Sequence, residues 1–358
     1  MHEPYSGSIN AQCAFTDKVP LFATTTGVVC SSKCHATMAA SFRPWILVSC
    51  TLLLAAACHG LQVGFYQKTC PSAEALVRAE VQKAVVKDAG LGAGLIRMLF
   101  HDCFVEGCDA SILLDPTPTN PKPEKKGAPN EASQRSYEVI DAAKAAVEKA
   151  CPNTVSCADI IAFAARDASD LLSGSKIRFA MPGGRFDGRS SQATQTNALP
   201  PPFGKLSDLT DKFTAKRMSV EDLVVLSGAH SIGRSHCTSF FFERVSSPSD
   251  MDASLVSQLK KQCPASPGPG NDPVVAEDVV TPNALDNQYY QNVLDRKVLF
   301  TSDAALMSSP QTAQMVRDLA RKDGSWEKKF AAAMVKLASI GVKTSRDGEI
   351  RKNCRVVK

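Results

Sequence analysis

The chain has 358 residues and a formal net charge of +5, with 41 Lys and Arg against 36 Asp and Glu. Hydrophobic residues make up 44% of the sequence, enough for a sizeable core, which excludes a wholly disordered protein. No apolar stretch suits a multi-span membrane protein, and no Lys/Arg run is dense enough to indicate a nucleic-acid site. Thirteen cysteines are many for a cytosolic enzyme, and an odd count cannot pair completely within one chain.

Residues 38–60 have the organisation of a secretory signal peptide. Arg43 supplies a positive charge, residues 45–57 form an apolar core, and small residues follow. This core is shorter than the roughly 20 residues that a membrane-spanning helix needs, so a cleaved signal is favoured over an anchor. We therefore expect the mature, secreted protein to comprise residues 61–358.

The residues before Met38 are polar, show no helical or strand period and are rich in Ser, Thr and Cys. We interpret residues 1–37 as a doubtful, unstructured leader, an extension of the gene model, with translation beginning at Met38. The alternatives are an organelle-targeting leader and a small metal site built from Cys30, Cys34 and His35. The metal alternative lacks a second Cys/His pair at matching spacing.

The cysteines fall into two populations that the signal peptide separates. Five of the 13 precede residue 61, and eight follow it. An even number behind a secretory signal predicts four disulfides in an oxidising compartment. Eight cysteines allow many pairings, so composition does not give the connectivity.

Apolar residues recur at helical spacing through most of the mature chain, and strand signals are few. The sequence from Ser219 to Asp222 resembles a capping box that opens a helix through Leu226. Helices are predicted at 73–88, 94–104, 136–150, 157–172, 219–226, 254–262, 287–295, 312–322 and 326–340, one strand at most at 176–181, and loops at 116–130 and 263–273. These elements predict one large, mainly α unit with two lobes, and two independent bundles are the alternative.

One of the three histidines in the mature chain shares a helical face with an arginine. Arg97 and His101 are four residues apart, so they project from one side of the predicted helix, beside Phe100 and Phe104. This arrangement suits an imidazole that moves a proton while a guanidinium stabilises developing negative charge. A satisfied structural His–Arg face is an alternative that the residues leave open.

A second histidine, His230, ends a predicted helix among small residues. The run from Ser227 to Gly233 would let a flat, wide group approach the backbone. As a metal ligand, His230 would need an acceptor on its other ring nitrogen. The alternative is an ordinary capping or surface histidine.

Two motifs around these histidines resemble the signatures of class III secretory plant peroxidases. The first runs from Cys103 to Ser111 (Cys-Phe-Val-Glu-Gly-Cys-Asp-Ala-Ser) and the second from Leu226 to Gly233 (Leu-Ser-Gly-Ala-His-Ser-Ile-Gly). Further matches at 65–71, 151–159 and 353–357 extend the resemblance over essentially the whole mature chain. The resemblance implies a mainly α, two-lobed haem peroxidase fold with minor β structure and one haem b between a distal and a proximal lobe.

The resemblance also implies catalytic roles for single residues. His230 matches the axial ligand of the haem iron, and Asp303 matches the carboxylate on its second nitrogen. Without the resemblance, Asp303 reads as a helix N-cap. On the opposite face, His101 matches the proton acceptor, Arg97 the transition-state stabiliser, and Asn130 the acceptor for the Nδ1 proton of His101.

Calcium ligands and disulfides follow from the same resemblance. Two Ca²⁺ ions are implied, each held by the oxygen ligands that hard cations prefer. The distal ligands are Asp102, Val105, Gly107, Asp109 and Ser111, with Glu124 acting through water, and the proximal ligands are Ser231, Asp278, Thr281, Ala284 and Asp286. The implied disulfides are Cys70–Cys151, Cys103–Cys108, Cys157–Cys354 and Cys237–Cys263, which use all eight mature cysteines. Without the resemblance, the acidic residues read as surface charges and turn formers.

The chain departs from the family pattern at three positions. Leu99 stands where many members have histidine, Phe186 replaces a usual second arginine, and Ser239 replaces an aromatic at the haem edge. We therefore expect altered hydrogen bonding beside the distal helix, a lost ion pair and a changed donor surface. Pro200 and Phe203 still match positions near the entrance for donors.

The function that the resemblance implies is reduction of hydrogen peroxide with oxidation of small phenolic donors in one-electron steps. We expect a secreted protein of the extracellular space and cell wall, with the vacuole as an alternative, and its mild positive charge suits cell-wall polyanions. We expect a monomer with no nucleic-acid and no membrane partner. Two alternatives are an inactive haem- or cell-wall-binding protein of the same fold and a structural protein, stabilised by disulfides and calcium, without haem.

Overall fold

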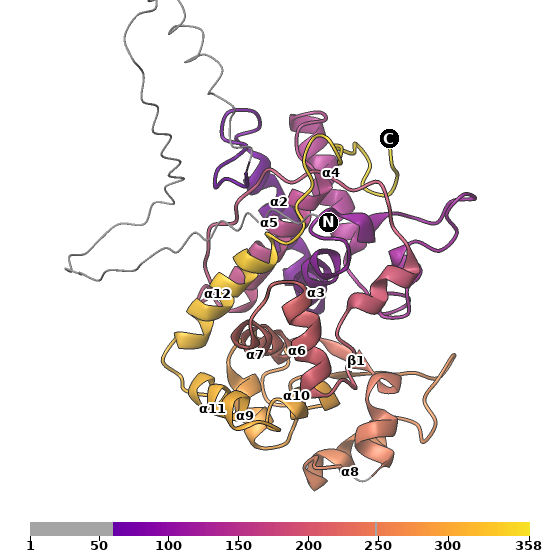
Figure 1. The fold of residues 1–358 in the computed structure, drawn as a ribbon, viewed down its shortest axis with the longest axis vertical. Helices are drawn as coiled ribbons and strands as arrows, with labels where there is room; N and C mark the ends of the chain where they lie inside the picture. Colours follow the sequence, from indigo (N-terminus) through magenta and orange to yellow (C-terminus); the bar gives the residue numbers. More distant parts are fainter. Residues whose placement is uncertain (1–59, 248) are drawn as a thin grey trace, which may run out of the picture. The chain divides into compact units, whose positions relative to one another are not determined.

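The computed structural model describes residues 60–247 and 249–358, which belong to one compact unit (Figure 1). The predicted leader at 1–37 and the predicted signal peptide at 38–60, apart from Gly60, lie outside the described residues. So do the five cysteines before residue 61 and the alternative metal site at Cys30, Cys34 and His35. Within the described ranges, no helix has the length and apolarity that a bilayer crossing requires.

Four helices pack together in the N-terminal half of this unit. They are α2 (Ala73–Lys87), α3 (Ala89–Val105), α4 (Tyr137–Ala150) and α5 (Cys157–Leu172). Helices α2, α3 and α4 all contact α5, which is rich in alanine and almost completely buried. Gly92 allows one close approach, because a Cβ there would lie 2.8 Å from side-chain atoms of both Leu172 and Val85.

The C-terminal half builds a second group of helices around α7 (Val220–Ser227). The predicted capping box opens this helix: Ser219 and Asp222 each accept a hydrogen bond from the other's backbone amide. The surrounding helices are α6 (Leu206–Ala215), α9 (Gln288–Leu294), α10 (Thr301–Ala305), α11 (Pro310–Leu319) and α12 (Ser325–Leu337). Helices α6, α11 and α12 contact α7, and α12 also contacts α3, which joins the two groups (Figure 1).

A small antiparallel sheet and α8 (Ala253–Gln262) accompany the second group. Strand β1 (Arg234–His236) pairs with β2 (Val274–Ala276), and Phe240 and Leu255 belong to a hydrophobic cluster separate from the main core. Short helical turns complete the chain: η1 (Ser111–Leu113), η2 (Glu124–Lys126), η3 (Ala193–Ala198), η4 (Gly228–Ser231), η5 (Cys237–Ser239) and the π-helical η6 (Phe242–Ser246). The predicted mainly α fold with minor β structure is confirmed.

The predicted strand at 176–181 is wrong. Its alternation of apolar and polar residues reflects anchoring in the core, because Ile177 and Met181 are buried. The amide of Ile177 donates to Oγ of Ser173 over 2.9 Å, so the backbone bonds to the end of α5 and not to a strand. Helix α6 and the short elements α10, β1 and β2 were not predicted, and the last three have five residues or fewer, too few for a period to show.

Helix α3 begins at Ala89, earlier than the predicted 94. Asp88 caps it, because its carboxylate accepts a hydrogen bond from the amide of Gly90 over 2.8 Å. The glycines that follow lowered the helical signal in the sequence, whereas in the structure they let α3 lie close to its neighbours.

Four disulfides are formed among the described residues. They are Cys70–Cys151, Cys103–Cys108, Cys157–Cys354 and Cys237–Cys263, the pairings that the resemblance implied. Cys157–Cys354 joins the first residue of α5 to the C-terminal segment, across 197 residues of sequence.

Candidate active site

Helix α3 presents Arg97 and His101 on one face, and a loop after η2 receives them. His101 is buried, at 7% exposure. Nη2 of Arg97 donates to the carbonyl oxygen of Pro129 over 2.7 Å and to Oγ of Ser133 over 3.2 Å. The guanidinium is therefore held by the loop rather than by a carboxylate partner, which keeps its charge available to a ligand.

The same loop sets the protonation pattern of His101 through Asn130. Oδ1 of Asn130 lies 2.6 Å from Nδ1 of His101, and Nδ2 of Asn130 donates to the carbonyl oxygen of Glu124 over 2.8 Å. Because that carbonyl takes the amide nitrogen, the atom that faces His101 is the amide oxygen, which can only accept. Nδ1 of His101 therefore carries the proton, and Nε2 keeps its lone pair.

The charge state of His101 follows from its surroundings. Burial holds the pKa of His101 well below its usual value, and the neighbouring charge of Arg97 lowers it further. The hydrogen bond with Asn130 acts in the opposite direction and is the smaller effect. His101 is consequently neutral at physiological pH, with Nε2 able to accept a proton.

His230 lies in η4, directly after α7, and bonds to a carboxylate from α10. Its Nδ1 is 2.9 Å from Oδ1 of Asp303, and the hydroxyl of Tyr289 donates to the same oxygen over 2.7 Å. Burial disfavours the charged imidazole, but the Asp303 carboxylate outweighs it and raises the pKa of His230 to about 9. The N-cap of α10 is Phe300, so Asp303 is not the N-cap that the alternative interpretation supposed. Nε2 is the ring nitrogen of His230 that remains for a ligand.

The two histidines lie on elements that contact each other, α3 and η4. The charge of Arg97 opposes protonation of both His101 and His230, so the three side chains share one electrostatic environment. Glu277 belongs to this environment as well: burial raises the pKa of its carboxyl, while the charges of His230 and Arg97 lower it. A Cβ on Gly233 would lie 3.3 Å from Oε2 of Glu277, which places that carboxylate against the chain just after His230.

Tyr289 and Glu277 belong to the site but were not predicted from the sequence. Neither residue lies in the motifs around the histidines, and no spacing pattern relates either of them to His230. The contact of α9 with η4 brings Tyr289 there, and the amide of Glu277 donates to the carbonyl of Gly233, just after η4, over 3.1 Å.

Three buried carboxylates interact with one another near the end of α3: Asp102 lies in its last turn, and Asp109 and Glu124 follow it in the chain. Burial raises the pKa of all three, and neighbouring carboxylates raise those of Asp102 and Glu124 further. In the described chain, Oδ1 of Asp102, Oγ of Ser111 and both carboxylate oxygens of Glu124 are buried without a hydrogen-bond partner. Such oxygens are destabilising unless something satisfies them, so the group indicates a cation site.

The other two predicted ligands of this distal site are Val105, the last residue of α3, and Gly107, in the turn that follows. The carbonyl of Val105 accepts from Nζ of Lys216 over 2.9 Å, which uses one of its two lone pairs. Gly107 has a φ of 99°, and a Cβ there would lie 2.5 Å from the carbonyl oxygen of Gly341. No three His, Cys, Asp or Glu side chains of the described residues converge as a metal group, so the predicted set depends on hydroxyl and carbonyl oxygens too.

The predicted proximal ligands form a connected group at the end of η4. Oγ of Ser231 accepts from the amide of Asp286 over 3.1 Å, and Oγ1 of Thr281 donates to Oδ1 of Asp286 over 3.1 Å. The amide of Ala284 donates to the carbonyl of Thr281, and Oδ1 of Asp278 accepts from the amide of Thr281 over 2.8 Å. Oδ2 of Asp278 is buried and has no hydrogen-bond partner among the described residues. Hydrogen bonds thus connect these five residues, and one carboxylate oxygen among them is unsatisfied.

The predicted donor-entrance residues lie in the loop before α6. Phe203 is 61% exposed and Pro200 is half-buried. The amide of Ser302 donates to the carbonyl of Pro202 over 2.9 Å, so this loop contacts the helix that carries Asp303.

The residues that depart from the family pattern occupy different surroundings. Leu99 is completely buried in the main core, and Ser239 is half-buried in η5. Phe186 forms a backbone bridge with Lys343. His236 is half-buried, and its Nδ1 lies 3.0 Å from the carbonyl oxygen of Asp272, away from the other two histidines' hydrogen bonds.

Comparison with known proteins agrees with this geometry. Residues 77–322 match the protein family described as Peroxidase. The chain is 57% identical to Peroxidase 2 of Zea mays, over 86% of this chain and 93% of that protein, and 50% identical to Peroxidase 1 of Zea mays, over 86% of each. It is 40% identical to the lignin-forming anionic peroxidase of Nicotiana sylvestris, over 88% of this chain and 97% of that protein. The chain therefore belongs to the class III plant peroxidases, secretory enzymes that typically bind haem and calcium and reduce hydrogen peroxide while they oxidise a donor.

Proposed function

We propose that this peroxidase binds one haem b beside α3 and η4, with His230 as axial ligand and His101 as proton acceptor. The observation that carries the proposal is the pair of hydrogen bonds at the two Nδ1 atoms. Asn130 engages Nδ1 of His101, Asp303 engages Nδ1 of His230, and each bond leaves Nε2 free for chemistry.

The donor set around His230 fits haem iron. An imidazole whose second nitrogen donates to a carboxylate is a stronger ligand, and histidine is the axial ligand in peroxidases. Tyr289 donates to the same Asp303 oxygen, which keeps that carboxylate in place against His230. When bound, the haem supplies the redox chemistry that reduces peroxide and takes electrons from donors.

On the face of the haem opposite His230, His101 transfers a proton and Arg97 stabilises developing negative charge. Nε2 of His101 takes the proton from one oxygen of hydrogen peroxide and returns it to the other oxygen, which leaves as water. The low pKa of His101 supports this role, because only the neutral imidazole can accept. Arg97 stabilises the negative charge that develops as the O–O bond breaks, and its contacts to Pro129 and Ser133 hold it for that purpose.

Two calcium ions complete the proposed enzyme. At the distal site, the carboxylates of Asp102 and Asp109 and the hydroxyl of Ser111 hold the ion with the carbonyls of Val105 and Gly107, and Glu124 acts through water. Partnerless oxygens at Asp102, Ser111 and Glu124 support this assignment. The proximal ligands are Ser231, Asp278, Thr281, Ala284 and Asp286, and the partnerless Oδ2 of Asp278 supports them. Each site adjoins a histidine in sequence, since Asp102 follows His101 and Ser231 follows His230.

The proposed donors are small phenols that dock near Pro200 and Phe203. The exposure of Phe203 supports this, because an aromatic ring offers an apolar face to a phenolic ring. The name of the Nicotiana sylvestris relative, a lignin-forming peroxidase, supports the same class of donor.

We also propose a monomer that works outside the cell, in the wall, and adheres to its polyanions. The four disulfides support an oxidising compartment. A surface hollow of about 460 Å³ is lined partly by Lys176, Lys322 and Lys328, which supports contact with an anionic polymer. The same hollow is also lined by the carboxylates of Asp286 and Glu327. Because salt screens interactions between exposed charges, binding of an anionic polymer there should weaken as ionic strength rises.

The proposal is tested with His101→Ala in the haem-loaded protein, with His236→Ala as the matched control. We expect His101→Ala to keep the Soret band and to lose about 10²- to 10⁴-fold in the rate of guaiacol oxidation with hydrogen peroxide. The control should keep both. Normal turnover in His101→Ala would refute the assigned role, and a haem-loaded wild-type protein without turnover would support the alternative of an inactive binding protein.

A further inference from the structure

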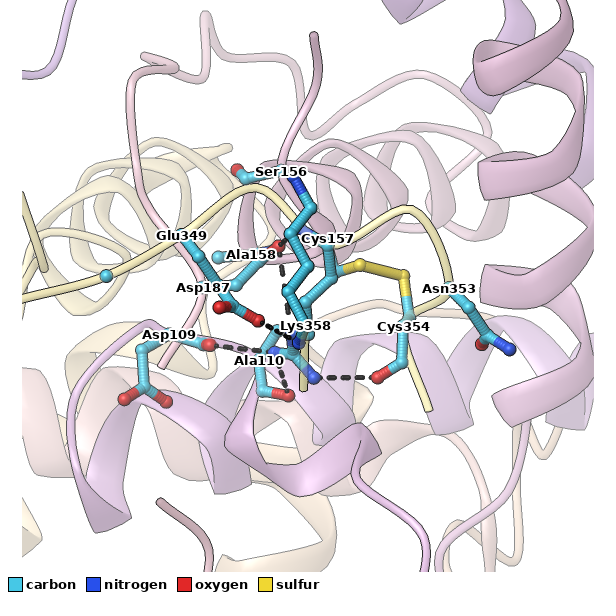
Figure 2. Close-up of polar contacts among 12 residues, drawn as sticks. Asp109, Ala110, Ser156, Cys157, Ala158, Asp187, Glu349, Asn353, Cys354 and Lys358 are labelled. Carbon is cyan, nitrogen blue, oxygen red and sulfur yellow. Dashed lines mark hydrogen bonds and ion pairs between the residues drawn. A yellow bond between two sulfur atoms is a disulfide. The ribbon is translucent and has the colours of Figure 1, made fainter. Parts of the chain in front are cut away.

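The guanidinium of Arg351, near the C-terminus, is completely buried and donates only to backbone carbonyls. Nη1 donates to the carbonyl of Cys354 over 2.7 Å. Nη2 donates to the carbonyl of Ala110 over 2.8 Å and to that of Asp109 over 3.2 Å. The carbonyls of Asp109, Ala110 and Cys354 thus converge on this one group, and Figure 2 shows these three residues with dashed lines from their carbonyl oxygens. The C-terminal segment is therefore hydrogen-bonded to the loop that contains Asp109 and Ser111, two of the proposed distal calcium ligands.

This loop contains a residue in an unfavourable backbone conformation. Ala110 lies in the left-handed region, with φ of 57° and ψ of 22°, which disfavours a residue with a Cβ. This conformation lets the amide of Ala110 donate to Oδ2 of Asp102 and the amide of Ser111 donate to Oδ1 of Asp109. Of the three carbonyls that Arg351 binds, two belong to Asp109 and Ala110, one on each side of the strained residue.

Arg351 is itself hydrogen-bonded to Asp187. One carboxylate oxygen of Asp187 accepts from the amide of Arg351, and the other accepts from the amide of Ala158 in the first turn of α5, each over 2.9 Å (Figure 2). The adjacent Cys157–Cys354 disulfide joins the same two segments. The backbone of Arg351 is thus fixed to α5 through Asp187, and Nε of its guanidinium forms an ion pair with the same carboxylate over 3.7 Å, so the position of Arg351 has a support outside the loop that it contacts.

We propose that Arg351 is a positioning residue of the distal calcium site, which fixes the backbone of Asp109 and Ala110 so that the ligand oxygens meet. This inference rests on the proposed assignment of calcium to that site. A buried cation near Ca²⁺ would by itself repel the ion, so the benefit must come from backbone geometry. The planar fork of arginine supplies that geometry, and lysine keeps the charge without the fork.

The chain offers a matched control in Arg185, a second completely buried arginine. It donates to the carbonyls of Ala338 and Pro182 and pairs with Asp159 over 2.7 Å, with no hydrogen bond to a distal calcium ligand. Arg185→Lys therefore removes a similar set of carbonyl contacts and should reduce stability in a similar way.

The experiment measures both calcium affinities of the haem-loaded protein in Ca²⁺/EGTA buffers, by metal analysis of the protein, together with its Tm. Asp109→Asn first identifies which of the two affinities belongs to the distal site. We expect Arg351→Lys to weaken that affinity at least tenfold and to change the other less than twofold. Arg185→Lys should lower the Tm and leave both affinities within twofold.

Three results would overturn the inference. Arg351→Lys with unchanged distal affinity would mean that the contacts only stabilise the fold. Equal weakening in Arg185→Lys would mean that any loss of stability has this effect. An Asp109→Asn variant with both calcium affinities unchanged would show that Asp109 does not bind calcium. That result contradicts the proposed function, and it differs from the first two because it does not involve Arg351.

Hydrogen exchange in the wild-type protein tests the same inference without a variant, should Arg351→Lys fail to fold. Calcium binding at the distal site should increase amide protection in residues 109–113 and 351–355 together. Increased protection in 109–113 alone would show that the C-terminal segment is independent of the site and would overturn the inference.

Discussion

Asn130 joins Nδ1 of His101 to the backbone of its own loop: its amide oxygen lies 2.6 Å from the imidazole while its amide nitrogen donates to the carbonyl of Glu124. Glu124 is also a proposed outer ligand of the distal calcium. The loop that orients the catalytic imidazole and the loop that completes the cation site are therefore one segment. A substitution at Asn130 should therefore affect the cation site, and a substitution at Glu124 should affect the orientation of His101.

Asn130→Ala should reduce the rate of peroxide reduction, because His101 loses the partner that keeps the proton on Nδ1. The reduction should be at least about tenfold and no greater than the roughly 10²- to 10⁴-fold contribution of the imidazole itself. Stopped-flow measurement of the reaction with hydrogen peroxide gives this rate directly.

Asn287→Ala is the control for this substitution. Asn287 is also buried, and its side-chain nitrogen donates to the carbonyls of Leu319 and Arg321, neither of which belongs to the loop that contacts His101. The control should lower the Tm and keep the peroxide rate. Equal rates in wild type and Asn130→Ala would show that His101 needs no orienting partner.

Asp303→Asn should make the haem iron easier to reduce, because the carboxylate on Nδ1 of His230 gives the imidazole anionic character. Turnover should fall about 10- to 100-fold. The measurement is the Fe(III)/Fe(II) midpoint potential by spectroelectrochemistry, which should rise.

Tyr289→Phe serves as the comparison, since it removes the second donor to the same Asp303 oxygen and leaves the carboxylate in place. It should shift the potential less than Asp303→Asn and in the opposite direction, because the carboxylate then interacts with His230 alone. A potential that does not change in Asp303→Asn would contradict the proposed role of this carboxylate.

Removal of calcium should lower the thermal stability of the enzyme. Binding at 100 times Kd contributes about 2.7 kcal/mol per site, so a strong chelator should lower the Tm by several degrees and added Ca²⁺ should restore it. Calorimetry with EGTA, Ca²⁺ or Mg²⁺ makes the measurement. Full recovery with Mg²⁺ would contradict sites built for the larger ion.

Asp222 should contribute stability that depends on pH in a defined direction. Burial disfavours its charge, but hydrogen bonds from Lys336 and Ser219 outweigh burial and lower the pKa of the carboxyl. A carboxyl whose pKa is lowered by folding stabilises the protein above its unfolded pKa, and this contribution is lost as pH falls through the folded pKa. Asp222→Asn should therefore cost about 0.3–1 kcal/mol at neutral pH, as expected for an acidic residue in a first helical turn.

Denaturant unfolding of wild type and Asp222→Asn at several pH values checks this prediction. The difference in unfolding free energy should be constant from neutral pH down to about pH 4 and should close below it. A difference that grows in acid would have the wrong sign and would contradict the assigned cause. The Soret band should be unchanged throughout, because Asp222 caps the far end of α7 from His230.

Local sequence determined most of the helices and one face of the site. Helical periodicity depends only on neighbours along the chain, so α2, α4 and α5 appear near their predicted positions. The spacing of Arg97 and His101 likewise determines that both side chains share a face, because residues four apart on a helix are neighbours. The motifs around the histidines were sufficient to indicate the family.

Local sequence patterns do not determine which distant groups act on those residues; the resemblance implied Asp303 and Asn130, and tertiary structure added Tyr289, Glu277 and Arg351. Asp303 meets His230 across 73 residues, and Arg351 meets Ala110 across 241. The periodicity of apolar residues along the chain does not indicate such contacts, because they arise from the packing of whole helices and from the Cys157–Cys354 disulfide. The error at 176–181 has the same origin: alternation along a chain does not reveal whether a neighbouring strand is present to pair with it. The sequence determined which residues carry the chemistry, and the packing decided their partners, charge states and orientation, since burial and distance exist only in the folded chain.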